Sequence, residues 1–416
     1  MTSCSQNTNG ACPTAGDALE VLLWFGASML RAGSTAFRTR EWMEVVALKL
    51  GFEAISVGLT IESITASVRR DGEWSTLVRE IGPLGVNAWR IGELEHLAKT
   101  LGPAPAPQYI ASRLAEIDTA APRYSNLETA AAVGVACGGF AFLNGGAVLE
   151  VIAAAAGGGL GQWLRLRLIR LRLNQYGVAA LSAVAASASY VAIAALAARL
   201  GLGIADQPGG FISSVLFLIP GFPLVAALMD LLQFQTGAAV TRLAYGTMIL
   251  LAAAFGLSIV IAFAGLNLTP QPPHDLAYPV KLLLRAAASF GAACGFALLY
   301  NSSARTLLAV GFIAMGANEL RLALYDAGMK LAPATFFGAI AVGLAASLFD
   351  RRPHVPRIAI TVPGVIVMVP GMYAFQMIVL FNRGQMLDAL QASASCGFVM
   401  GAMAMGLAAA RFITQR

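Results

Sequence analysis

Apolar segments long enough to cross a membrane recur along the last three-quarters of this 416-residue chain. A transmembrane helix needs about 20 mostly apolar residues. Ten segments fit this length, and they occupy residues 128–144, 146–164, 177–198, 211–231, 239–264, 280–299, 306–324, 331–349, 358–380 and 387–410. The sequence therefore predicts an all-α polytopic membrane bundle of ten transmembrane helices.

The first part of the chain has the composition of a soluble domain. Residues 17–118 carry 10 Lys or Arg and 13 Asp or Glu, whereas residues 119–416 carry only 18 and 9. Helical periodicity surrounds a β-rich stretch with an Asp71-Gly72 turn, which predicts a small α+β domain. We expect the following organisation: a disordered N-terminus at 1–16, a cytoplasmic soluble domain at 17–118, and two membrane halves at 119–270 and 271–416.

Basic residues indicate the orientation of the bundle. With the soluble domain in the cytoplasm, eleven Lys or Arg lie on the cytoplasmic side and roughly six on the other. We therefore expect a multi-pass protein of the cell inner membrane with both termini in the cytoplasm. The net charge of +9 in residues 119–416 suits anionic lipid and requires no nucleic acid.

The residue types that hold metals and cofactors are sparse. The five cysteines are scattered, and three of them lie in apolar segments. The three histidines, His96, His274 and His354, are isolated from one another. We therefore expect no metal site and no cofactor. No phosphate-loop lysine is visible, which argues against ATP-driven transport by this chain alone.

The two membrane halves resemble one another. Gly139-Phe-Ala-Phe-Leu143 recurs as Gly295-Phe-Ala-Leu-Leu299, an offset of 156, and each is followed by an Asn-containing turn. Ile219-Pro-Gly-Phe222 recurs as Val369-Pro-Gly-Met372, an offset of 150. Because each half has five segments, an odd number, the second half must enter the membrane from the opposite side. The pattern predicts two inverted five-helix repeats, an arrangement common in secondary transporters.

Prolines interrupt the fourth and ninth segments. A proline lacks an N–H donor and disrupts the hydrogen bond to the carbonyl four residues earlier. We expect free carbonyls at Leu216, Ile219, Ala359 and Ile366. Breaks at equivalent places favour a binding site, whereas a single proline is also explained by a structural kink. The predicted substrate-binding residues are Asn144, Gly145, Gly146, Pro220, Gly221, Pro223, Asn301, Pro363, Pro370 and Gly371.

Several ionisable residues lie within or beside the apolar segments. Such residues are costly in a bilayer and must face a partner or water. Glu150 and Asp230 are the candidate proton-coupling residues, with a purely structural role as the alternative. We expect Glu319 and Arg321 to pair or to reach toward a helix end, and Asp388 to lie at the membrane interface.

The motifs, taken in order, resemble those of the threonine/serine exporter family. In the soluble part the resemblance rests on Gly33-Ser-Thr-Ala-Phe-Arg38-Thr-Arg-Glu41. In the first membrane half it rests on Asn144-Gly-Gly followed by Glu150, and on Ile219-Pro-Gly-Phe-Pro223 followed by Asp230 and Arg242. In the second half it rests on Val362-Pro-Gly and Val369-Pro-Gly. Thr35 occupies a place where the family often has an acid.

The resemblance implies a function and a chain organisation. It implies a non-enzymatic secondary transporter that exports threonine and serine, coupled to the proton motive force by antiport. Family members occur as one fused chain or as two subunits, and this chain would be the fused form. Two alternatives remain open: export of a small carboxylate such as succinate, and a membrane-anchored sensor or enzyme that uses the soluble domain. The expected partners are small amino acids, protons and the lipid bilayer, and a homo-oligomer also remains open.

Overall fold

The computed structural model describes residues 15–202, 208–264, 277–350 and 352–414. The chain divides into two compact units: Met1–Gly85 with Arg90–Ala121, and Val86–Trp89 with Pro122–Arg416. The predicted disorder of residues 1–16 lies outside the described residues, except that Ala15 and Gly16 begin the first helix. The elements of the first unit are α1 (Ala15–Arg31), α2 (Ala36–Lys49), β1 (Ala54–Leu59), β2 (Ser63–Arg70), β3 (Glu73–Glu80), α3 (Ala88–Thr100) and α4 (Pro107–Thr119).

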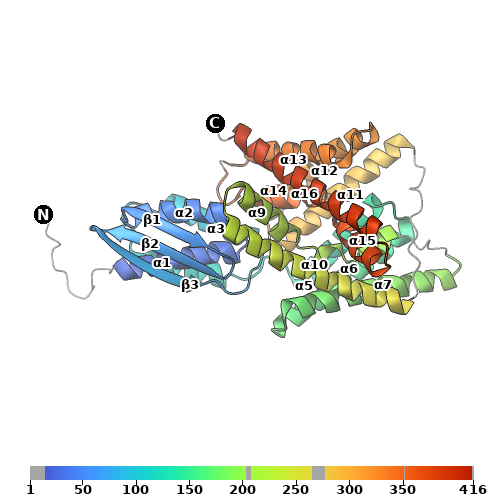
Figure 1. Cartoon of the computed structure of the whole chain (residues 1–416), viewed down its shortest axis with the longest axis horizontal. Coiled ribbons are helices and arrows are strands. Elements are labelled where there is room, and N and C mark those ends of the chain that lie inside the picture. Colours follow the sequence, from blue (N-terminus) through green and yellow to red (C-terminus); the bar gives the residue numbers. More distant parts are fainter. Residues whose placement is uncertain (1–14, 203–207, 265–276, 351, 415–416) are drawn as a thin grey trace. The chain divides into compact units, whose positions relative to one another are not determined.

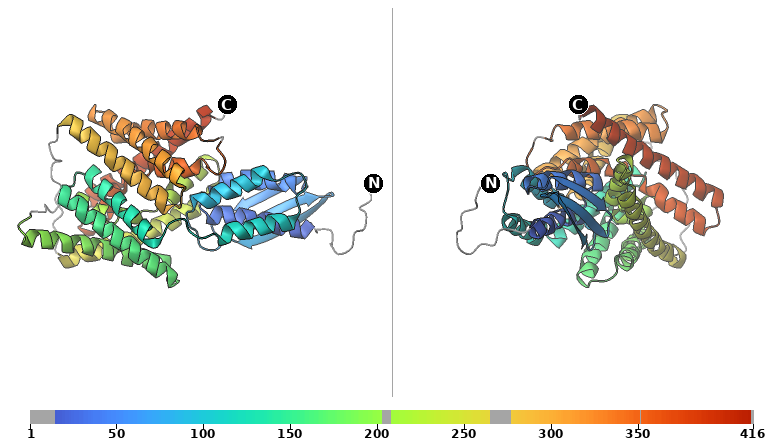
Figure 2. Two further views of the ribbon diagram at one scale, coloured as in Figure 1. Left: turned by 180° about the vertical axis from the view of Figure 1, so that it is seen from behind. Right: turned by 60° about the vertical axis from the view of Figure 1, so that its left-hand side comes forward.

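The first unit is an antiparallel three-stranded sheet with helices packed on one face (Figures 1 and 2). The strand order is β1-β2-β3, and the predicted Asp71-Gly72 turn joins β2 to β3 with positive φ at both residues, as a two-residue hairpin loop requires. Ile64, Ala66 and Val68 alternate along β2 as its buried face. The core is therefore formed by this face and the helices packed against it.

Asp118, near the end of α4, links three helices of this unit. Its Oδ2 accepts hydrogen bonds from Trp24 Nε1 at 2.9 Å and Ser28 Oγ at 3.0 Å, and it pairs with Arg31 at 3.0 Å. Its backbone carbonyl accepts from Arg90 Nη2 of α3 at 2.7 Å. Because Trp24, Ser28 and Arg31 follow helical spacing, one face of α1 is held to α4.

Helices make up the second unit, and each of the ten predicted apolar segments contains helical structure. The elements are α5 (Asn126–Leu143), α6 (Val148–Arg170), α7 (Gln175–Arg199), α8 (Pro208–Ser213), the 3₁₀ turn η1 (Leu216–Leu218), α9 (Gly221–Leu232), α10 (Thr236–Ala264), α11 (Tyr278–Leu299), α12 (Ala304–Asp326), α13 (Leu331–Ser347), α14 (Ile358–Ile366), α15 (Gly371–Asn382) and α16 (Met386–Thr414).

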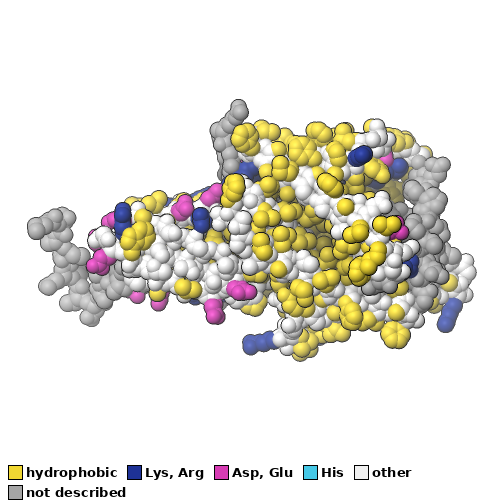
Figure 3. Space-filling view, in the orientation of Figure 1, with side chains coloured by type: hydrophobic (Ala, Val, Ile, Leu, Met, Phe, Trp, Pro, Cys, Tyr) yellow, Lys and Arg dark blue, Asp and Glu magenta, His cyan; other side chains and the backbone are white. Residues whose placement is uncertain are grey.

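Six of the described helices are long and apolar enough to cross a membrane: α5, α7, α10, α11, α12 and α16. The pair α14 and α15, bent by 51°, brings the number to seven if it forms one span. α9 and α13 are apolar but shorter. In α6, Glu150, Gln162 and a run of glycines lower the hydropathy of a helix of 23 residues. Hydrophobic side chains cover much of the visible surface of this unit (Figure 3), as expected for helices that face lipid.

The two halves of the second unit repeat one packing pattern. In the first half, α5 packs on α6, α6 on α7, α7 on α10, and α9 on α10. In the second half, α11 packs on α12, α12 on α13, α13 on α16, and α15 on α16. Contacts between the halves are matched as well. α9 of the first half packs on α14 and α16 of the second, and its counterpart α15 packs on the counterparts of those two helices, α8 and α10.

The first helices of the two halves, α5 and α11, cross in an antiparallel and reciprocal way. Gly139 lies directly against the carbonyl of Ala288, and Gly295 lies directly against the carbonyl of Ala132. These are the same contact with the halves exchanged, because both residue pairs differ by 156. Only glycine permits such an approach, since a Cβ at either position would overlap the facing backbone.

Candidate functional site

The two broken helices have the same backbone at their breaks. α9 begins after Pro220 and α15 after Pro370, with φ, ψ of −76°, 55° and −78°, 52° respectively. The two prolines, which lie 150 residues apart, therefore have the same backbone conformation. Pro223 lies in the first turn of α9, where a backbone N–H would have no partner within the helix, so proline is tolerated there. Pro363 lies inside α14.

The expectation of free carbonyls at the breaks is wrong for three of the four residues named above. The Leu216 carbonyl accepts from Ile219 N at 3.1 Å, and the Ile219 carbonyl accepts from Gly221 N at 2.7 Å. The Ile366 carbonyl accepts from Val369 N at 3.1 Å. The chain tightens into turns before each proline, so these polar groups are satisfied locally.

The breaks of the two halves pack against each other. A Cβ on Gly221 would lie 3.1 Å from Cδ1 of Ile366 and 3.9 Å from Cγ2 of Val369. Gly371 lies against Leu216 and Ile219, the residues 150 positions before Ile366 and Val369. The predicted residues Pro220, Gly221, Pro370 and Gly371 are therefore brought together where the halves meet.

A buried ion pair follows the first break. Asp230 of α9 has no exposed surface, Arg242 of α10 is 2% exposed, and Arg242 Nε lies 3.9 Å from Asp230 Oδ2. Arg242 lies within α10 and not in a loop, so its charge is inside the helix bundle beside Asp230. The signal that could have revealed the pair is the short α9–α10 turn, which brings residues twelve positions apart onto facing helices.

Glu150 and Asn144 lie beside the short helix α8, which leads into the first break. Glu150 is fully buried in the first turn of α6, and its Oε2 accepts from Ala147 N at 2.7 Å. A Cβ on Gly210 of α8 would lie 2.9 Å from Glu150 Cβ and 2.6 Å from Tyr190 Oη. Asn144 Nδ2 donates to Ser213 Oγ at 3.2 Å. A carboxylate, an amide and two hydroxyl groups thus surround the first turn of the broken span.

The turns after α5 and α11 share a helix-ending motif but not the position of the asparagine. Gly145 and Asn301 both have positive φ, 88° and 59°. Gly146 N donates to Ala141 O, as Ser302 N does to Ala297 O, which is the Schellman pattern. Asn301 therefore corresponds to Gly145 and not to Asn144.

The described hydrogen bonds of the Asn301 side chain go to Asn87 and to the segment before α5. Its Oδ1 accepts from Arg123 N at 2.9 Å, and its Nδ2 donates to Asn87 Oδ1 at 3.1 Å. The neighbouring Ser302 carbonyl accepts from Tyr124 Oη at 2.8 Å. The adjacent Tyr300 packs its ring against Phe222 in the first turn of α9, with ring centroids 5.2 Å apart, and Gly146 lies beside Glu150.

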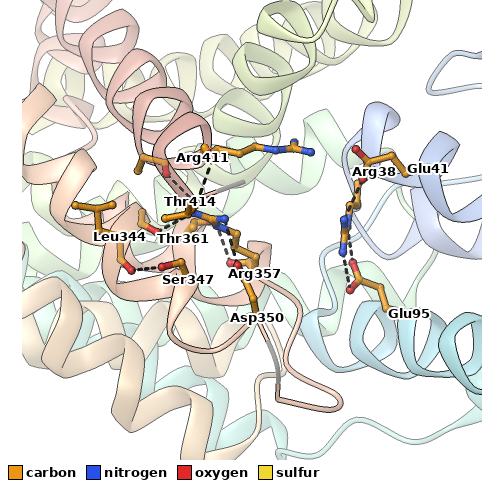
Figure 4. Close-up of polar contacts among 12 residues, drawn as sticks. Arg38, Glu41, Glu95, Leu344, Ser347, Asp350, Arg357, Thr361, Arg411 and Thr414 are labelled. Atoms are coloured by element: carbon orange, nitrogen blue, oxygen red, sulfur yellow. Dashed lines mark hydrogen bonds and ion pairs between the residues drawn. The ribbon is translucent and has the colours of Figure 1, made fainter. Parts of the chain in front are cut away.

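Two arginines of the second half bind backbone carbonyls. Arg357, directly before α14, donates through Nη2 to Gly343 O and Thr414 Oγ1, both at 2.9 Å, and pairs with Asp350 (Figure 4). Arg321 Nη1 donates to Met368 O at 3.5 Å, two residues before Pro370. Arg321 thus contacts the residues just before the second break.

The motif around Arg38 in the first unit forms an ion cluster. Arg38 binds both carboxylate oxygens of Glu95, at 3.1 and 3.3 Å, and Glu41 at 2.9 Å (Figure 4). Its guanidinium group also stacks on the Trp42 ring. Burial lowers the pKa of Arg38, but the carboxylates of Glu95 and Glu41 outweigh that effect and raise the pKa above its ordinary value. The motif therefore holds α2 to α3.

The apolar helices and the two packed breaks describe a multi-pass membrane transporter. The chain belongs to the threonine/serine exporter family. The family profile described as "Putative threonine/serine exporter" matches residues 20–264, and a second, "Threonine/Serine exporter, ThrE", matches residues 285–413. The resemblance drawn from the motifs is thereby confirmed.

Curated relatives carry two kinds of name. A "Probable threonine/serine exporter" of Mycobacterium tuberculosis is 27% identical over 380 residues, 87% of this chain and 70% of that protein. The "Probable succinate transporter subunit YjjP" of Escherichia coli is 24% identical over 248 residues, 58% of this chain and 93% of that protein. Its Klebsiella aerogenes namesake is 23% identical over 245 residues. No solved structure matches the chain.

Proposed function

We propose that this chain is a secondary transporter that exports threonine and serine across the inner membrane, driven by the proton motive force and without an enzymatic step. The observation that carries the proposal is the reciprocal packing of the two breaks, Gly221 on Ile366 and Gly371 on Ile219. A binding site between two such repeats is a recurrent arrangement in secondary transporters. Membership of the family and the name of the M. tuberculosis relative support the substrate.

The proposed topology has ten spans in two inverted repeats with both termini in the cytoplasm. The matched packing of the halves and the antiparallel contact of Gly139 with Ala288 and of Gly295 with Ala132 support it. A two-fold axis that relates α5 to α11 must be perpendicular to both helices, because only then does it reverse the direction of the helix. In a membrane such an axis lies in the bilayer plane, which reverses the second half. The distribution of Lys and Arg favours the cytoplasmic termini.

The breaks suit the carboxylate of an amino acid. α9 and α15 each begin at a break, and a helix N-terminus presents backbone N–H groups and a partial positive charge to a carboxylate. We propose that the substrate binds between the breaks with its carboxylate toward these N-termini.

Glu150 is the better of the two candidates for proton coupling. A carboxylate that carries a proton must become neutral during part of the cycle. For Asp230, neutralisation would remove the negative charge that lies beside the buried Arg242 and is therefore costly. Glu150 lies at a helix N-terminus and accepts a backbone N–H. We propose that Glu150 takes up the proton as an amino acid leaves.

Export of a small carboxylate such as succinate is the alternative. The names of the E. coli and K. aerogenes relatives favour it, and half-helix N-termini would accept a second carboxylate as readily.

Counterflow in proteoliposomes separates the two substrates. Vesicles containing the full chain and loaded with threonine receive labelled threonine, serine or succinate outside. The proposal predicts uptake of threonine and serine that excess unlabelled threonine abolishes. Uptake of succinate alone would replace the proposed substrate with a dicarboxylate, and no uptake of any of them would contradict transport of either class.

A further inference from the structure

Two buried side-chain amides occupy equivalent positions in the two halves. Gln162 of α6 and Asn318 of α12 are separated by 156 residues, the offset of the repeat, and neither has any exposed surface. Among the described residues, neither polar atom of the Gln162 amide has a hydrogen-bond partner. Asn318 Nδ2 donates to Ser289 Oγ at 2.8 Å, whereas its Oδ1 has no described partner.

Such groups are uncommon in folded proteins. A buried amide without a hydrogen bond loses its interactions with water and gains none in return. At the same place in the repeat, Gln162 carries this cost on both polar atoms of its amide and Asn318 carries it on its carbonyl oxygen. A ligand that supplies the hydrogen bonds would remove it.

Both amides lie close to the breaks. A Cβ on Gly161, the neighbour of Gln162, would lie 3.0 Å from Cζ of Phe217 in η1. In the second half, a Cβ on Gly338 would lie 3.1 Å from the carbonyl of Ala317, the neighbour of Asn318, and 3.0 Å from Sδ of Met368. Phe217 lies three residues before Pro220, and Met368 lies two residues before Pro370. Each amide is thus on a helix that packs beside the break of its own half.

The depth of the two residues is also matched. α6 spans Val148–Arg170 and α12 spans Ala304–Asp326, so each amide lies three residues beyond the middle of its helix. At 1.5 Å per residue this is about 4.5 Å from the middle. In inverted repeats the displacements are opposite, so the amides lie on either side of the bilayer midplane, where such transporters bind their substrates.

We propose that Gln162 and Asn318 recognise the side-chain hydroxyl of the transported amino acid, one from each half. The assignment rests on the proposed function. An uncharged amide offers both donors and acceptors, as a hydroxyl does, whereas the substrate carboxylate is matched by helix N-termini. A site built to bind a hydroxyl discriminates against an analogue that lacks it, because its polar groups then remain unpaired.

The test compares threonine with 2-aminobutyrate, which has the same carbon skeleton without the hydroxyl. In counterflow of labelled threonine, the concentrations of unlabelled threonine and 2-aminobutyrate that halve uptake give a preference ratio. The Gln162→Met and Asn318→Leu variants should each lower this ratio roughly three- to tenfold, the value of one neutral hydrogen bond. Because the Gln162 amide has no described partner, Gln162→Met should also leave the thermal midpoint unchanged or raise it.

Two control variants separate recognition from packing. Ser187→Ala removes a buried hydroxyl that already donates to Ala183 O at 2.7 Å, and Ser289→Ala removes the described partner of Asn318 while keeping the amide. Both should retain the wild-type ratio. An unchanged ratio in both amide variants, with active wild-type protein, would overturn this assignment and leave the proposed function intact. Absence of threonine exchange by the wild type would overturn both.

Should an amide variant fail to transport, threonine binding decides the outcome. Threonine should raise the thermal midpoint of the detergent-solubilised wild type. It should raise that of each amide variant less, while 2-aminobutyrate acts alike on all. Equal stabilisation of wild type and variants by threonine would overturn the assignment.

Discussion

Gly371, the first residue of α15, packs directly against Ile219, which lies just before the break in the other half. Gly221 makes the corresponding contact with Val369, 150 residues further along. The two breaks are therefore parts of one structure in which each half covers the break of the other. A side chain at Gly371 would push the halves apart where we place the substrate.

The first prediction concerns this contact. Gly371→Val should lower the free energy of unfolding by about 1–3 kcal/mol, the usual cost of overpacking a filled core. It should also reduce threonine counterflow by the protein that remains folded. Thermal unfolding in detergent and counterflow in vesicles measure the two effects. Gly401→Val is the matched control, because nothing lies within 4 Å of a Cβ at Gly401 on α16. Equal activity of both variants would argue against a functional contact.

The second prediction concerns the Asp230–Arg242 pair. Arg242→Gln should destabilise the protein by about 3–5 kcal/mol, because it leaves a buried carboxylate without the cation beside it. The double variant Asp230→Asn, Arg242→Gln should recover most of the lost stability, since no isolated charge remains. If the double variant is as unstable as the single one, the two side chains do not act as a pair.

The third prediction concerns Glu150. Glu150→Gln keeps the shape of the side chain and removes its charge. It should permit exchange of threonine for threonine while abolishing the response of threonine efflux to a pH gradient. The Asp230→Asn, Arg242→Gln variant should keep that response. The reverse result would assign the proton to Asp230.

The fourth prediction concerns the first unit. Arg38→Ala leaves Glu95, which is 4% exposed, without its bidentate partner. Thermal unfolding should shift by the equivalent of about 2 kcal/mol. Arg113→Ala breaks an exposed pair with Glu116 and should change stability by about 1 kcal/mol or less. Because the Arg38 pKa is raised above its ordinary value, its stabilisation is fully present below the ordinary arginine pKa and is lost only as the pH rises through the raised one. The effect should therefore be constant between about pH 5 and 9.

Features with a local cause could be predicted from the sequence. Asp71-Gly72 forms a hairpin because two residues that tolerate positive φ follow one another. Pro220 and Pro370 end helices because proline lacks an N–H. The apolar segments become helices, since backbone groups in lipid must be satisfied within the segment.

Features that depend on the arrangement of helices could not be predicted in the same way. The carbonyls of Leu216 and Ile366 are satisfied by turns whose form the proline alone does not fix. The burial of Arg242 depends on α10 facing α9. Gln162 and Asn318 lie at the repeat offset, so a comparison of the halves position by position would have paired them. Their burial without described partners is visible only in the structure.

Efflux of labelled threonine from proteoliposomes tests the central claim most directly. Vesicles loaded with labelled threonine are diluted into buffers that impose a pH gradient or none, with empty liposomes and the Gly371→Val variant alongside. The account predicts fast efflux from wild-type vesicles, faster still when protons flow opposite to threonine, and slow efflux from the variant. Efflux equal to that of empty liposomes under every gradient would contradict it.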